Sequence, residues 1–204
     1  MRLEELRMDW KIVTAIVVST LTLTVAHYHR VFHHRSYDQV LFYLAVPLLT
    51  IVLVFRELPA AYGFQLGDWK AGLLLTAVGC GGMALVIFLL ARTDHFQGYY
   101  APQAKSTIPM PLANALELFA WEFLFRGFLL FALYRICGPY AILIQAMPFA
   151  VAHFGKPEIE TLSCIFGGSL LGYVAWRTQS FLYPFVIHWF MATWMILVAS
   201  GAVG

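Results

Sequence analysis

The sequence predicts an all-α fold: a polytopic bundle of transmembrane helices that encloses a cavity. Apolar residues make up 61% of the 204 residues and charged residues only 12%, whereas about a quarter of the residues of a soluble domain are charged. Several apolar stretches also approach the roughly 20 residues needed to cross a bilayer core about 30 Å thick. The composition therefore indicates an integral membrane protein.

Seven stretches are apolar enough to be spans, and six is the alternative number. The expected spans are 10–28, 39–55, 71–91, 110–134, 139–154, 159–176 and 180–200. The stretch 139–154 is the weakest, because it is short and contains Pro148 and His153, so we expect a helix there more firmly than a full span. No long linker and no internal repeat interrupts the chain, and residues 1–204 are expected to form a single membrane domain.

Two glycines in the run GGSLLG predict a close helix contact. Gly168 and Gly172 stand four residues apart within the expected span 159–176. Small residues at this spacing let the backbones of two membrane helices approach closely. We expect packing within the chain before dimerisation.

The charge balance narrows the choice of partners. The net charge is +2 and no basic run is interleaved with aromatic residues, so the sequence gives no sign of a nucleic-acid partner. The apolar stretch 10–28 is not followed by a small-residue cleavage site, and we interpret it as a retained anchor rather than a signal peptide. The expected surroundings of the protein are therefore the lipid bilayer.

Several ionisable residues lie inside the expected spans, where each costs on the order of 3 kcal/mol at the centre of the bilayer. These ionisable residues are Glu117, Glu122, Arg126, His153 and His188. One neutral polar residue, Asn114, lies in the same spans. Ionisable residues at such positions indicate a functional site by default. They are the candidate site residues of this chain.

Glu122 and Arg126 stand four residues apart in the stretch AWEFLFRGF, so their side chains lie on one helix face and can form an ion pair. One interpretation is a structural pair that locks two helices together. The other is a reactive site, because His153 and His188 follow in later spans, each in an aromatic setting.

A glutamate and two histidines can carry out hydrolysis in two ways. The carboxylate can accept a proton from water while the histidines donate hydrogen bonds to an oxyanion or protonate a leaving amine. Alternatively, Glu122, His153 and His188 match the ligand set of a catalytic zinc ion. We prefer the version without a cofactor. The HExxH and GxSxG signatures of other hydrolases are absent from the sequence.

The remaining polar residues of the span 110–134 differ in their expected direction. Asn114 lies about 80° from Glu122 around the helix and can reach the same cavity. Glu117 lies roughly 140° from Glu122 and is expected to be a partner for another helix rather than a second catalytic carboxylate.

Three motifs resemble those of the CPBP family of intramembrane proteases, which includes the type II CAAX prenyl endopeptidases and the bacterial Abi immunity-type proteins. The family patterns are EExxxR, FxxxH and HxxxN or HxxxD on three membrane helices. They correspond here to WEFLFRG from Trp121, FAVAH from Phe149 to His153, and HWFMA from His188 to Ala192. The resemblance extends over about 56–195.

The resemblance implies a glutamate-dependent endopeptidase with Glu122, Arg126, His153 and His188 as catalytic residues and Phe149 as a supporting residue. It also implies a membrane-associated peptide or protein tail as substrate, and the cytoplasmic membrane of a bacterium as location. Two family positions differ: Trp121 stands in place of the first glutamate, and Ala192 in place of the closing Asn or Asp.

These differences leave two interpretations open. In one, Glu122 alone activates water, and Asn114 or a backbone amide replaces the missing contact to the oxyanion. In the other, the chain is a membrane scaffold that binds a peptide without cutting it. A third hypothesis, a proton-relaying transporter, lacks the inverted repeat that such proteins contain.

Overall fold

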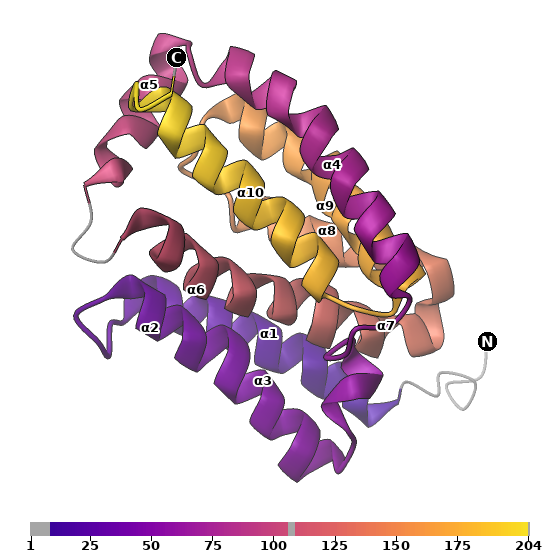
Figure 1. Cartoon of the computed structure of the whole chain (residues 1–204). Coiled ribbons are helices and arrows are strands. Elements are labelled where there is room, and N and C mark those ends of the chain that lie inside the picture. The colour runs from indigo at the N-terminus through magenta and orange to yellow at the C-terminus, as the bar shows by residue number, and fades with distance from the viewer. Residues whose placement is uncertain (1–8, 106–108, 204) are drawn as a thin grey trace.

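The computed structural model describes residues 9–105 and 109–203, and within them every regular element is helical (Figure 1). The α-helices are α1 (Trp10–Tyr28), α2 (Arg35–Gln39), α3 (Val46–Leu49), α4 (Trp69–Leu90), α5 (Asp94–Tyr100), α6 (Met110–Glu122), α7 (Leu130–Cys137), α8 (Ala141–Val151), α9 (Glu158–Thr178) and α10 (Leu182–Ala199). The π-helical segments are η2 (Val40–Ala45), η3 (Thr50–Phe55) and η6 (Phe123–Leu129), and the 3-10 segments are η4 (Pro59–Tyr62), η5 (Ala101–Ala104) and η7 (Gly138–Tyr140). The predicted all-α class is confirmed.

Six helical segments of the described residues are long and apolar enough to cross a membrane. They are Trp10–Tyr28, Arg35–Phe55, Trp69–Leu90, Met110–Val151, Glu158–Thr178 and Leu182–Ala199. The number is the smaller of the two expected from the sequence. The protein is therefore an integral membrane protein with several spans.

The seventh expected span, 139–154, is corrected to a short helix. The chain turns at Gly138, whose φ of 51° suits a glycine, and continues through η7 into α8. Because α8 has 11 residues and rises 1.5 Å per residue, it is only about 16 Å long, which is too short for the bilayer core. It packs instead against α7 and α9.

The helix α6 runs through the middle of the molecule. Figure 1 shows it between α2 and α3 on one side and α10 on the other, and α6 contacts both α2 and α10. Its continuation η6 is buried at every position, as expected of a helical segment that is apolar on nearly all sides. Glu122 at the end of α6 and Arg126 in η6 are therefore fully enclosed by the bundle.

The helices α8 and α9 are in close contact because of the two glycines. A Cβ atom on Gly168 would lie 2.9 Å from the ring of Phe149, and one on Gly172 would lie 2.6 Å from the amide nitrogen of Gln145. No side chain fits at either position without displacing its neighbour. The expected packing within the chain is confirmed, and it brings the backbone of α9 to the site.

Candidate active site

Glu122 and Arg126 form the ion pair that their spacing predicts. Glu122 ends α6 and Arg126 lies in η6, and both side chains are fully buried. Arg126 Nη1 donates to Glu122 Oε1 over 2.9 Å. Two opposite charges without contact to water stabilise each other far more than a surface pair does, and each would be costly to bury alone.

Neighbouring helices hold the guanidinium of Arg126 in place. Its central carbon lies 3.8 Å from the centre of the Phe149 ring, a cation–π contact with α8. Nη2 also donates to the backbone oxygen of Gly168 on α9 over 3.4 Å, and Gln145 Nε2 donates to the same oxygen over 2.9 Å. The ion pair is thus held in place by two neighbouring helices, α8 and α9.

His188 on α10 completes a chain of charged and polar groups. Its Nδ1 lies 2.6 Å from the same oxygen of Glu122 that accepts from Arg126. The second oxygen, Oε2, is buried and has no hydrogen-bond partner among the described residues. A carboxylate that accepts a proton from Nδ1 fixes the orientation of the imidazole ring, so Glu122 positions His188.

His153 follows the end of α8 and is held by the backbone. Its Nδ1 lies 2.7 Å from the carbonyl oxygen of Phe149. Because a carbonyl oxygen only accepts hydrogen bonds, Nδ1 carries a hydrogen, and Nε2 of the neutral ring carries a lone pair. The rings of His153 and His188 are nearly parallel, with centres 6.4 Å apart and an angle of 24° between their planes.

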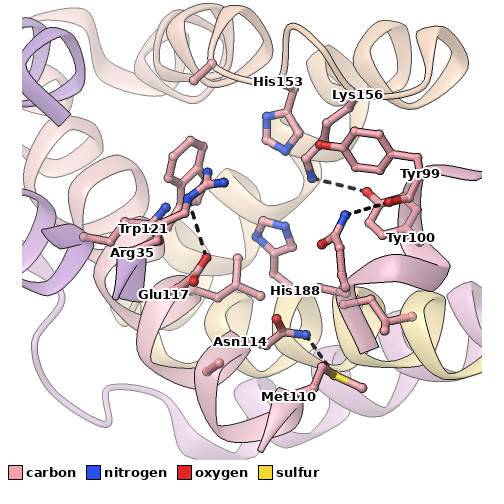
Figure 2. A pocket seen from close by; sticks show the side chains of 17 residues that line it. Arg35, Tyr99, Tyr100, Met110, Asn114, Glu117, Trp121, His153, Lys156 and His188 are labelled. Atoms are coloured by element: carbon pink, nitrogen blue, oxygen red, sulfur yellow. Dashed lines mark hydrogen bonds and ion pairs between the residues drawn. The ribbon is translucent and has the colours of Figure 1, made fainter. Parts of the chain in front are cut away.

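Both histidines line one cavity of about 350 Å³. Figure 2 shows His153 and His188 at its centre, Lys156 and Tyr100 on one side, and Arg35, Glu117 and Trp121 on the other. Glu122 and Arg126 are not among the residues that line it. The structure therefore brings the four predicted catalytic residues together, but only the two histidines face the cavity, and Glu122 lies behind His188.

Asn114 also lines the cavity, but Glu122 does not, although the angle of about 80° between them on the helix predicted that both would reach it. Its Nδ2 makes two long contacts of 3.4 Å, to Met110 Sδ and to Thr193 Oγ1. Ala192 lines the same cavity, so no polar side chain is supplied at that position of α10. The amide of Asn114 is held only weakly and can turn toward a ligand.

Sequence reasoning missed a polar cluster on the cavity wall opposite α6. Lys156 Nζ donates to Glu160 Oε1 over 2.9 Å and to Tyr100 Oη over 3.3 Å, and Tyr100 Oη donates to Glu160. Burial, aided by the Glu160 carboxylate, raises the pKa of the Tyr100 phenol above its usual range, so the group remains neutral. Lys156 follows His153 by three residues, which was the available signal. Nothing in the sequence relates Tyr100 to it.

The structure offers no fit for the zinc ion that the sequence left open. No group of three His, Cys, Asp or Glu side chains among the described residues could hold a metal ion. Glu122 Oε1 and His188 Nδ1 bind each other, so these atoms are not free to converge on a metal with His153. We derive no reaction step through a metal.

The fold and the site define a membrane protein in which a buried Glu–Arg–His chain supports a polar cavity between helices. A family model described as Rce1-like, type II CAAX prenyl endopeptidase, matches residues 103–194. This range contains all three motifs, and the resemblance inferred from them is confirmed. No curated protein and no solved structure matches the chain.

Proposed function

We propose that the protein is an intramembrane endopeptidase that cleaves a membrane-associated peptide or protein tail and depends on Glu122. The observation that carries this proposal is the contact of Glu122 with His188, which directs a histidine into a cavity already lined by His153. The family match to the type II CAAX prenyl endopeptidases supports a protease. The proposed location is the cytoplasmic membrane of a bacterium.

In this proposal His188 stabilises the oxyanion that forms when water attacks the peptide bond. A protonated histidine donates from both ring nitrogens: Nδ1 donates to Glu122, and Nε2 donates into the cavity. Glu122 compensates the positive charge of the ring, and Arg126 holds Glu122. Glu122 thus promotes the reaction through His188, since it does not line the cavity itself.

His153 and Asn114 take the remaining polar contacts. The lone pair on His153 Nε2 accepts a hydrogen from the attacking water and orients it, because Nδ1 is occupied by Phe149. The Asn114 amide supplies a second donor to the oxyanion. It replaces the Asn or Asp of the family motif, whose position is occupied here by Ala192. Two aligned donors of this kind contribute several kcal/mol to a transition state, about 3 kcal/mol each.

One observation favours a second candidate function, a scaffold that binds a peptide without cutting it. Glu122 has no exposed surface, and Trp121 occupies the position where the family keeps its first glutamate. If no other group of the cavity takes over the activation of water, a protein with this cavity would bind a peptide without cutting it.

Cleavage of a defined probe separates the two functions. The purified protein is reconstituted in liposomes with an internally quenched peptide that carries a prenylated cysteine. We expect cleavage by the wild type, and a rate at least 100-fold lower for Glu122→Gln. Glu158→Gln, at an exposed position on α9, serves as the matched control and should retain the wild-type rate. Binding of the probe without cleavage by the wild type would support the scaffold instead.

A further inference from the structure

The cavity contains a carboxylate that the proposed function does not use. Glu117 lines the cavity beside His188, whereas Glu122 does not. About 27% of the Glu117 side chain is exposed, compared with 0% for Glu122. Water in the cavity therefore reaches Glu117 and not Glu122.

The direction of Glu117 follows from the geometry of α6. The residues of this helix that line the cavity recur every three or four positions: Met110, Ala113, Asn114, Glu117, Leu118 and Trp121. They form one face of the helix, and Glu117 is the ionisable member of this face. Trp121 lies one turn further along the same face, and Glu122 points away from it.

The contacts of Glu117 leave one of its oxygens available. Ser36 Oγ on α2 donates to Oε1 over 3.0 Å. Oε2 accepts no hydrogen bond from the residues that the structure describes, and Arg35 Nε lies 4.0 Å away from it. Figure 2 shows Glu117 between Arg35 and the centre of the cavity. One oxygen is thus anchored to α2, and the other makes only a long ion pair with Arg35 and can accept a hydrogen bond from water.

We propose that Glu117 is the general base of this site. The inference rests on the proposed endopeptidase function. Glu117 Oε2 takes a proton from water as the water oxygen bonds to the peptide carbon, and the carbonyl oxygen becomes an oxyanion bound by His188 and Asn114. The carbon–nitrogen bond then breaks and the proton passes from Glu117 to the leaving amine. The products are a carboxylic acid and an amine, and Glu117 returns to its carboxylate form.

Cleavage of the prenylated quenched peptide in liposomes tests the role in turnover. We expect kcat of Glu117→Gln to fall 100-fold or more with little change in KM, and Glu117→Asp to recover part of the loss. In the double variant Glu117→Gln with Trp121→Glu, a carboxylate returns one turn along the same face, and kcat should rise at least 10-fold above that of Glu117→Gln alone. Wild-type kcat for Glu117→Gln, beside an inactive Glu122→Gln, would overturn this inference and leave the proposed function intact.

A second experiment tests the accessibility of Glu117 without any substrate. Each position is changed to cysteine in turn and treated with a small water-soluble thiol reagent, and the wild type gives the background of the native cysteines. We expect Glu117→Cys and Leu118→Cys to react, and Ala120→Cys, which is fully buried on the same helix, to stay unmodified. An unreactive Glu117→Cys in a folded protein would overturn the proposal. If the wild type cleaves nothing although Glu117→Cys reacts, the proposed function fails, and the general base fails with it.

Discussion

Two glutamate-centred clusters of this protein have similar partners and different surroundings. Glu122 lies inside the bundle, where Arg126 and His188 bind it and both ends of the ion pair are fully buried. Glu57 lies between η3 and η4, where Lys11 and Tyr62 bind it and Arg135 contacts both of its oxygens. Its side chain and those of its two cationic partners are 23–30% exposed.

The two clusters contribute differently to stability and to the site. At Glu57 water replaces a lost partner, so each contact there adds little to stability. At Glu122 no water is available, and a lost partner leaves a charge without compensation. The outer cluster, centred on Glu57, connects α1 and α7 to the segment before η4. The inner cluster, centred on Glu122, sets the position of His188 in the cavity. Changes to the inner cluster should therefore have the larger effects.

The largest expected effect is that of Arg126→Met. The change leaves Glu122 buried without its cation and should lower the free energy of unfolding by about 3–5 kcal/mol. Thermal or denaturant unfolding in detergent measures it. The matched control is Arg135→Met in the outer cluster, with an expected loss of about 1 kcal/mol or less. Equal losses for the two variants would contradict the comparison.

His188→Ala should separate activity from stability. Among the described residues, the ring is the hydrogen-bonded link between Glu122 and the cavity, so cleavage of the probe peptide should fall about 100-fold or more. The loss of a hydrogen bond to the buried Glu122 should cost about 1–3 kcal/mol of unfolding free energy. His95→Ala, at an exposed position on α5, is the control and should change neither quantity. A cleavage rate unchanged by His188→Ala would remove His188 from the mechanism.

Gly168→Ala tests how tightly the inner cluster is packed. An added methyl group would press on Phe149 and approach Arg126 Nη2 to 3.4 Å, and overpacking of this kind costs about 1–3 kcal/mol. The neighbouring Gly167 has no atom within 4 Å of an added Cβ. Gly167→Ala should therefore be neutral or stabilising by up to about 1 kcal/mol. The opposite order of the two variants in thermal unfolding would show that α8 and α9 are less tightly packed than the structure indicates.

The sequence predicted most of the fold and part of the site. Hydropathy predicted seven spans with six as the alternative, and six helical segments are long and apolar enough to cross a membrane, because helices in lipid must be apolar over most of their length. The spacing of four residues predicted the Glu122–Arg126 pair because neighbours on a helix follow from geometry alone. The short α8 was predicted less well, since apolar composition does not distinguish a helix that crosses the membrane from one that packs inside the protein.

The sequence does not determine in which direction the two glutamates of α6, Glu117 and Glu122, point. Their separation around the helix is a local property, and the expected angle of roughly 140° is consistent with their different surroundings. Which of them faces the cavity depends on the rotation of α6 against α2 and α10, which no local pattern determines. Arg35 and Tyr100 were missed for the same reason, because only the tertiary structure brings them to the cavity.

The smallest expected effect is a pH dependence of the outer cluster. The hydrogen bond from Arg135 is the main cause that lowers the pKa of Glu57 to about 2, whereas the pKa of an unfolded glutamate is about 4.3. A lowered pKa stabilises the folded protein above the unfolded value, and this contribution is lost as the pH falls from about 4.3 to about 2. Other carboxylates titrate in the same window, so the difference in unfolding temperature between the wild type and Glu57→Gln is the quantity to measure. The difference should shrink as the pH falls, and high salt should reduce it at neutral pH. A difference independent of pH would mean that Glu57 acts through packing against Tyr62 and not through its charge.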